Sequence, residues 1–351
     1  MTVLLPLHVK KLGALEKRQT SFIEQAVHLA IQQQTNLVIS ISCDEIKAHV
    51  DCIDAIWEQI QAFLGTVYVI QLNTSYKQNE PLFDCNVVFA DVCGYNVYQE
   101  PYIKTVCVSS EHTQDIQQQH PSLQTHVLAS DDQTEQPALE GNTGPIEPLV
   151  FQRVAVGGTF DHLHAGHKIL LTMTAILANQ SMVVGVTDDC MLLKKKHRDL
   201  IASTQQRVEY VKAYLQLVKR SIAYHVVPIT DPFGPTVTDP TIDALVVSKE
   251  TLKGGDLVNS ERDMRGYPPL ELRIIDVISS ENASVQGKDM DVLKISSSWI
   301  REYIANKRRA AVVRIKSRAE YTRVANKNGI RAWYICVCMM YSGVWYVQRT
   351  M

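Results

Sequence analysis

Apolar residues recur with two different periods along the chain, and both periods occur in residues 1–108. Helical spacing brings the apolar side chains of residues 20–33 onto one face, which predicts a helix there. Short apolar runs at 37–42, 67–72 and 86–90 are typical of strands. The pattern predicts an α/β unit over residues 1–108. This unit has no recognisable phosphate loop, metal-ligand spacing or catalytic cluster, so its role stays open.

A polar segment, residues 109–150, follows this unit. It contains no Lys or Arg, is rich in Gln, Ser, Thr, Asp and Glu, and ends in Gly-Pro and Glu-Pro steps. A segment of this composition has little apolar surface to bury. The sequence therefore predicts a flexible linker at 109–150.

Strand and helix patterns alternate between residues 151 and 305. Strands are predicted at 153–156, 182–186, 224–228, 244–247 and 270–277, and helices at 166–177, 204–218 and 297–304. Apolar strands alternating with helices favour a parallel sheet covered on both faces. Such sheets bind ligands at the carboxyl ends of their strands. We predict a Rossmann-like, doubly wound α/β domain at 151–305, preceded by a smaller α/β domain.

Composition and charge exclude some classes of protein. Hydrophobic residues make up 46% of the 351 residues and charged residues 21%, which is typical of a soluble globular chain. The net charge of −2 gives no general bias toward nucleic acid, and we expect no nucleic-acid partner. The eight cysteines form no C-x-x-C pair, so we predict reduced thiols, no zinc site and a cytoplasmic location.

The C-terminal tail, residues 306–351, differs from the rest. It holds ten Lys or Arg and one acidic residue, and it includes an apolar stretch at 333–347. A basic segment followed by an apolar one could bind an anionic membrane surface. The alternatives are a disordered extension or an artefact of the gene model. No apolar run reaches the ~18–20 residues of a membrane span.

A glycine- and histidine-rich segment carries the chemistry. The first strand of the second domain runs into Gly157-Gly158-Thr159-Phe160-Asp161-His162-Leu163-His164-Ala165-Gly166-His167. Glycines allow a close approach of the backbone to a ligand, and the helix that follows offers unpaired N–H groups to phosphate. His164 and His167 lie three residues apart and can point the same way. The segment predicts a phosphate site, and the alternative is that the histidines only cap the helix.

A second motif lies near the end of the domain. It reads Ile295-Ser296-Ser297-Ser298-Trp299-Ile300-Arg301. Hydroxyl and N–H groups at a helix start suit phosphates, and Arg301 adds a cation one turn later. Taken alone, the serines could equally form a polar N-cap.

The two motifs resemble the H-x-G-H and I-S-S-[ST]-x-x-R signatures of the nucleotidyltransferase superfamily. The segments 231–235, 246–251 and 254–262 are similar to the eukaryotic-type phosphopantetheine adenylyltransferase, and the resemblance covers about residues 152–305. In animals that enzyme is fused to dephospho-coenzyme A kinase. No G-x-x-x-x-G-K-[ST] occurs in this sequence, so we expect no kinase domain here.

The resemblance implies roles for individual residues. For catalysis it implies His167, His164 and a loop lysine, Lys194 or Lys196. For ATP binding it implies Gly158, Thr159, Phe160, His164, His167, Ser296, Ser297, Ser298 and Arg301. For the acceptor substrate it implies Thr159, Asp231, Pro232, Phe233, Lys249, Asn259 and Arg262. Arg207 matches a family arginine but could equally be a structural partner. We predict no protein metal site, with Mg²⁺ held mainly by the substrate phosphates.

The implied reaction is transfer of AMP from ATP to 4′-phosphopantetheine, which gives dephospho-coenzyme A and pyrophosphate in coenzyme A biosynthesis. In-line attack on the α-phosphate, stabilised by the histidines, would need no covalent intermediate. Association with other enzymes of coenzyme A synthesis is a further expectation, and the oligomeric state stays open. The alternatives are another nucleotidyltransferase, such as a cytidylyltransferase, or a non-catalytic nucleotide-binding scaffold.

Overall fold

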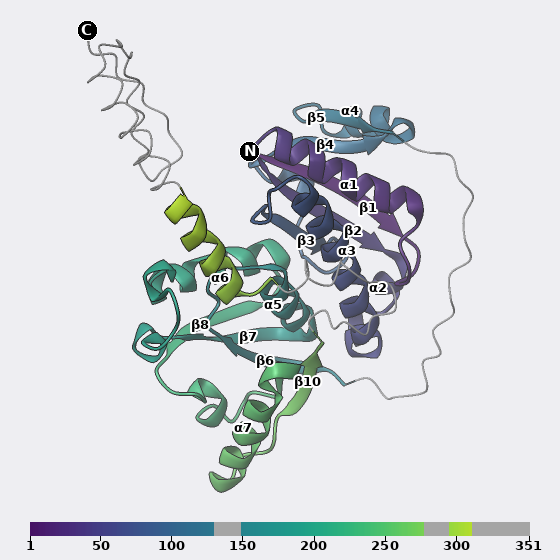
Figure 1. Cartoon of the computed structure of the whole chain (residues 1–351). Coiled ribbons are helices and arrows are strands. Elements are labelled where there is room, and N and C mark those ends of the chain that lie inside the picture. The colour runs from purple at the N-terminus through teal and green to yellow at the C-terminus, as the bar shows by residue number, and fades with distance from the viewer. Residues whose placement is uncertain (130–148, 277–294, 311–351) are drawn as a thin grey trace, which may run out of the picture. The chain divides into compact units, whose positions relative to one another are not determined.

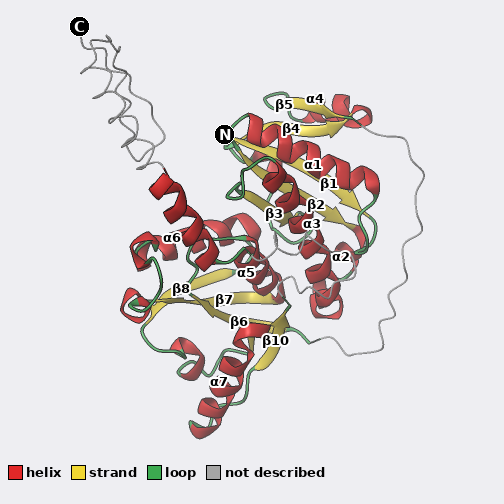
Figure 2. Ribbon diagram, viewed as in Figure 1, coloured by secondary structure: helices red, strands yellow, loops and turns green. Residues whose placement is uncertain are grey.

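The computed structural model describes residues 1–129, 149–276 and 295–310. Met1–Ile300 form one compact unit, and the chain divides after Ile300. This unit contains two parallel five-stranded sheets with their helices (Figures 1 and 2). We call residues 1–129 the first domain and residues 149–300 the second domain.

The sheet of the first domain has the strand order β3-β2-β1-β4-β5, with every neighbouring pair parallel. Its order reverses between β1 and β4, as in a doubly wound fold. The main elements are β1 (Thr2–Val9), α1 (Lys17–Gln32), β2 (Asn36–Cys43), α2 (Asp44–Ala48), α3 (Trp57–Lys77), β3 (Cys85–Phe89), β4 (Ile103–Ser109), α4 (Thr113–Gln119) and β5 (Gln124–Leu128).

Two predictions for the first domain were wrong. Residues 67–72 lie within helix α3 and not in a strand. The buried positions of α3 recur at helical spacing from Ile60 to Leu72, but a six-residue apolar window is too short to show that period. Residues 113–128 form α4 and β5 and complete the sheet, where the polar composition predicted linker. The polarity is explained by position, because β5 is an edge strand whose residues are mostly exposed or half-buried.

The sheet of the second domain has the order β10-β9-β6-β7-β8, again all parallel. Both sheets therefore share one topology, and the prediction of a doubly wound parallel domain is confirmed. The main elements are β6 (Phe151–Gly158), α5 (Ala165–Leu177), β7 (Ala178–Thr187), α6 (Thr204–Val218), β8 (Ala223–Ile229), β9 (Ala244–Ser248), α7 (Leu252–Met264) and β10 (Glu271–Ile275). A further helix covers 297–310, and Ser203 caps α6.

Alternation along the strands divides the apolar side chains of the second sheet between its two faces. Val154 and Val156 of β6 join the core under α5 and α6. Ala155, between them, joins a separate core with Val258 of α7. Helices therefore cover both faces of the sheet, and the carboxyl ends of its strands are left to the connecting loops.

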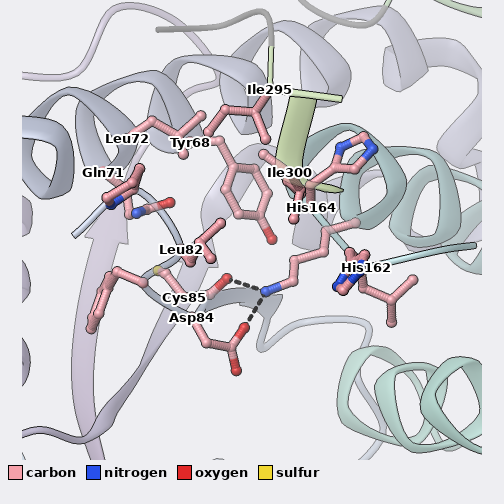
Figure 3. A pocket seen from close by; sticks show the side chains of 15 residues that line it. Tyr68, Gln71, Leu72, Leu82, Asp84, Cys85, His162, His164, Ile295 and Ile300 are labelled. Atoms are coloured by element: carbon pink, nitrogen blue, oxygen red, sulfur yellow. Dashed lines mark hydrogen bonds and ion pairs between the residues drawn. The ribbon is translucent and has the colours of Figure 1, made fainter. Parts of the chain in front are cut away.

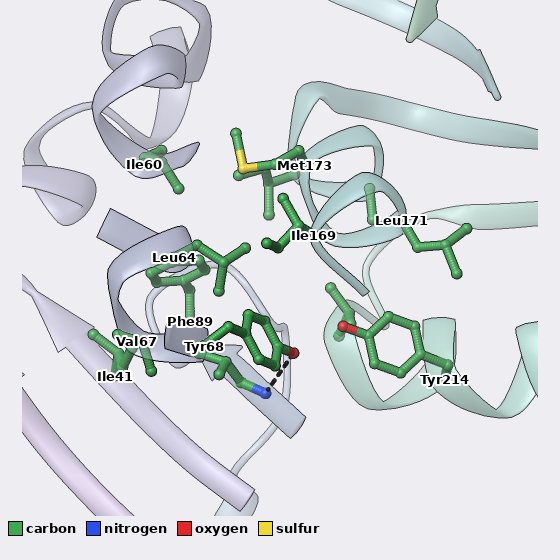
Figure 4. Packing of buried hydrophobic residues seen from close by; sticks show 14 of the residues in the cluster. Ile41, Ile60, Leu64, Val67, Tyr68, Phe89, Ile169, Leu171, Met173 and Tyr214 are labelled. Carbon is green, nitrogen blue, oxygen red and sulfur yellow. Dashed lines mark hydrogen bonds between the residues drawn. The ribbon is translucent and has the colours of Figure 1, made fainter. Parts of the chain in front are cut away.

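The two domains share one hydrophobic core. Residues of α3, including Leu64, pack with Ile169 and Met173 of α5 (Figure 4). Within this contact the indole Nε1 of Trp57 donates a hydrogen bond to the Met173 carbonyl at 3.2 Å. The first domain therefore packs against the helix that begins at the H-x-G-H motif.

No helix in the described ranges is long and apolar enough to cross a membrane. The membrane prediction concerned the C-terminal tail, and residues 311–351 lie outside the part of the chain that the structure describes. The same is true of residues 130–148, which are part of the predicted linker.

Candidate active site

The H-x-G-H motif lies at the carboxyl end of β6, the central strand of the second sheet. The strand order reverses between β6 and β9, so this end is the topological switch point of the domain. Residues at the ends of β6 and β7 pair in register there, with Gly158 opposite Val186. Ligands of doubly wound sheets bind at this position, which supports the predicted location of the site.

The turn after β6 is shaped by its backbone. Phe160 and His162 both have left-handed backbone angles, with φ of +50° and +51°. The ring of Phe160 is fully buried and folds back under the strand end, where a Cβ on Gly158 would come within 3.1 Å of it. Phe160 was predicted to contact ATP, but in this structure its side chain packs inside the turn.

The two motif histidines face each other at the start of α5. His164 occupies the N-cap position and His167 lies in the first turn, with ring centroids 4.0 Å apart. The His164 side chain makes no capping hydrogen bond within the described structure, so capping does not account for it. The Nδ1 atom of each ring is buried and has no hydrogen-bond partner among the described residues. Both rings therefore retain a polar atom that a ligand oxygen could satisfy.

The imidazoles are held in the neutral form. Burial lowers the pKa of His167 from its ordinary value of 6.5 to about 4, and the positive charge of Lys195 acts in the same direction. Burial also lowers the pKa of His164, with further contributions from His167 and Lys168. At neutral pH each ring thus carries one N–H donor and no net charge.

The serine motif lies against the histidine turn. The Ser297 hydroxyl donates to the Asp161 carbonyl at 2.7 Å and so joins the two signatures across 136 residues of sequence. Ser296 caps the helix that starts here, because its hydroxyl accepts from the Trp299 N–H at 3.3 Å. Ser298 and Arg301 continue the same helix, and Arg301 is the first residue beyond the compact unit.

Arg207 supports the turn from α6. Its guanidinium is fully buried and donates to the carbonyls of Thr159 and Thr187 at 2.8 and 2.7 Å. It also pairs with the Asp189 carboxylate at 2.7 Å. Of the two interpretations left open for Arg207, these contacts favour the structural one, because they fix the ends of β6 and β7 relative to each other.

Two loops at the same sheet edge contain other predicted site residues. Lys194 and Lys196 lie in the loop after β7 with exposed side chains. Lys195, between them, is the lysine whose positive charge lowers the pKa of His167. The sequence alone could not distinguish it from its two neighbouring lysines. After β8, the Asp231 carboxylate accepts hydrogen bonds from the N–H groups of Phe233 and Gly234 at 2.8 Å and so shapes that loop. Pro232, which follows Asp231, is exposed.

Three residues predicted to bind the acceptor make contacts within the domain. Arg262 is fully buried and donates to the carbonyls of Pro268, Thr236 and Asp239. Asn259 bonds to the backbone N–H and C=O of Leu270. Lys249 forms an ion pair with Asp276. The contacts of Arg262 and Asn259 hold α7 against the segment before β10, which is a structural role.

Sequence patterns did not show that residues of the first domain lie beside the histidine turn. A cavity of about 230 Å³ is lined by residues of α3 and the segment before β3, and by residues 162–165 of the histidine turn (Figure 3). Lys168 lies in its wall and pairs with Asp84 of the first domain.

Within the described ranges no three or more His, Cys, Asp or Glu side chains group to hold a metal ion.

Comparison with known proteins agrees with this geometry. A family model described as Cytidylyltransferase-like matches residues 155–303, which include both motifs. A phosphopantetheine adenylyltransferase of Pyrococcus abyssi is 36% identical over 153 residues, covering 44% of this chain and 90% of that protein. The chain belongs to the phosphopantetheine adenylyltransferase family. It is therefore a nucleotidyltransferase of the kind that the two motifs indicated.

Two fungal proteins are also similar to this chain. The phosphopantetheine adenylyltransferase of Saccharomyces cerevisiae is 29% identical over 252 residues, covering 70% of this chain and 78% of that protein. Because less than 70% of the chain follows residue 129, this match includes part of the first domain. An uncharacterized protein of Schizosaccharomyces pombe is 46% identical over 151 residues, and the chain spans about half of its length, 48%.

Proposed function

We propose that the protein transfers AMP from ATP to 4′-phosphopantetheine, giving dephospho-coenzyme A and pyrophosphate. The observation that carries this proposal is the pair of neutral imidazoles at the switch point, each with a buried Nδ1 atom that has no partner in the described structure. They lie beside a helix start whose Ser297 contacts the same turn. The relatives named phosphopantetheine adenylyltransferase support the choice of substrates.

The reaction requires the transfer of one group. An oxygen of the 4′-phosphate forms a bond to the α-phosphorus of ATP, and the bond from that phosphorus to the bridging oxygen of pyrophosphate breaks. The attacking phosphate is already anionic at neutral pH, so no strong general base is needed. Catalysis then depends on alignment and on stabilising charge at the α-phosphoryl oxygens.

Each polar group has a role in that scheme. His167 donates its N–H to a non-bridging oxygen of the α-phosphate, while His164 and Ser296–Ser298 hold the rest of the triphosphate. Thr159 and a lysine of the 194–196 loop steady the incoming phosphate, and the charge effect on His167 favours Lys195. Mg²⁺ enters with ATP and is held mainly by phosphate oxygens, in keeping with its preference for such ligands.

Another nucleotidyl transfer is the second candidate, because the matching family model is described as Cytidylyltransferase-like. A pyrophosphate-release assay with a panel of nucleotides and acceptors separates the two. We expect turnover with ATP and 4′-phosphopantetheine, and little with CTP. Faster release with CTP would support the second candidate, and no release with any acceptor would support a non-catalytic scaffold.

A further inference from the structure

Lys168 follows the H-x-G-H sequence directly. Its backbone N–H donates to the His164 carbonyl at 2.9 Å and so closes the turn that contains both histidines. Its side chain lines the same cavity as His164 and is almost wholly buried, with 5% of the residue exposed. A buried ammonium group is stable only if it is paired and hydrogen-bonded, so its partners show what it holds.

Both partners of the ammonium group come from the first domain. Nζ donates to Asp84 Oδ1 at 2.5 Å and to the Cys85 carbonyl at 2.9 Å (Figure 3). Cys85 is the first residue of β3, an edge strand of the first sheet, and Asp84 directly precedes it. One side chain therefore connects the first turn of α5 to the other domain.

The backbone of Lys168 is held by a second helix of its own domain. Its carbonyl accepts from the Tyr214 hydroxyl at 3.1 Å, and that hydroxyl lies 2.8 Å from the hydroxyl of Thr172. Tyr214 belongs to α6, the helix that also carries Arg207. Lys168 is thus fixed by α6 through its backbone and by the first domain through its side chain.

We propose that Lys168 is a positioning residue through which the first domain sets the orientation of the H-x-G-H turn. The inference rests on the proposed adenylyl transfer. Because His164 and His167 share a turn with Lys168, a displaced Lys168 backbone would move both rings. A misplacement of about 1 Å, caused away from the chemistry, can lower a rate by about a hundredfold. The first domain would then contribute to turnover without contacting either substrate.

The test removes the carboxylate and leaves the lysine in place. The Asp84 side chain is 46% exposed, so Asp84→Ala leaves no large core cavity, but it leaves the buried Lys168 ammonium with the Cys85 carbonyl and without a carboxylate. We therefore expect a folded full chain with a lowered melting temperature, and kinetics are measured well below it. We expect kcat to fall by about tenfold to a hundredfold, with the KM for ATP changed by less than about threefold. Asp84→Glu, which keeps the charge, should restore most of the loss.

A second ion pair between the domains provides the matched control. Asp54 of the first domain pairs with Arg273 at 2.8 Å, but Arg273 lies on the edge strand β10 and not on α5. Asp54→Ala should lower the melting temperature and leave kcat within about twofold of wild type. If Asp54→Ala and Asp84→Ala lower kcat equally, the pair is only a tether between domains and the proposal is wrong.

Hydrogen exchange gives a readout that does not depend on the reaction. In Asp84→Ala, amides of residues 164–170 should exchange faster than in wild type, whereas Asp54→Ala should leave them unchanged. Unchanged exchange in Asp84→Ala would overturn the inference whatever the substrates are. A wild-type chain that lacks turnover would instead count against the proposed function, while the exchange result would still test the positioning role.

Discussion

The two histidines of the turn occupy different positions at the proposed phosphate site. His164 stands at the N-cap of α5 and His167 one turn inside it, against the buried ring of Phe160. Neither ring is charged at neutral pH, because burial lowers both pKa values. In the proposed reaction each therefore acts through an N–H group, and its effect depends on where that donor points.

At the scale of single residues, His167→Ala should lower kcat by ~10²–10³ while changing the KM for ATP far less. The reason is that a preorganised donor to the α-phosphate stabilises charge that develops during transfer. His162→Asn is the control. The His162 ring contacts the Leu200 carbonyl, and Asn tolerates the left-handed backbone of that position. Steady-state kinetics should show kcat of His162→Asn near wild type. Equal losses in both variants would remove His167 from its assigned role.

The lowered pKa of His167 also predicts a pH dependence of stability. Between about pH 4 and 6.5 the unfolded chain binds a proton that the folded His167 does not, so the free energy of unfolding falls as the pH falls. From pH 6.5 to about pH 5 the contribution is roughly 1–2 kcal/mol. Urea denaturation of His167→Ala should show a smaller fall over this range than wild type. Identical falls would mean that the pKa of His167 is not lowered.

At the scale of elements, α6 holds the ends of β6 and β7 together through Arg207. Replacement by Leu leaves buried carbonyls without donors, and we expect Arg207→Leu to lower the free energy of unfolding by about 3 kcal/mol. The control is Arg18→Ala, which removes a largely exposed pair with Glu111 and should cost less than ~1 kcal/mol. Urea denaturation measures both, and similar values would show that the Arg207 contacts are weak.

Elements with strong local signals were predicted from the sequence, and elements defined by tertiary packing were not. The strand and glycine turn before α5 are specified by neighbouring residues, so β6 and the motif were found together. Helix α3 was misread because its apolar run at 67–72 fits either period, and only packing against α5 decides between them. The Lys168–Asp84 pair joins residues 84 positions apart, and no local pattern indicates such a contact.

At the scale of the molecule, the shared core predicts that the two domains unfold together. Leu64 of α3 is fully buried in that core, so Leu64→Ala should lower the free energy of unfolding by about 2–5 kcal/mol. In a thermal melt of the full chain we expect a single transition, shifted as a whole by the substitution. Two transitions, of which only one moves, would show that the domains are independent.

The central claim is that AMP passes directly from ATP to 4′-phosphopantetheine at the histidine turn. The most direct test supplies the full chain with ATP labelled at the α-phosphorus and follows the label. The account predicts that label enters dephospho-coenzyme A in a one-to-one ratio with pyrophosphate, and that His167→Ala slows this by ~10² or more. Label that remains in ATP, or appears only as free AMP, would contradict the claim.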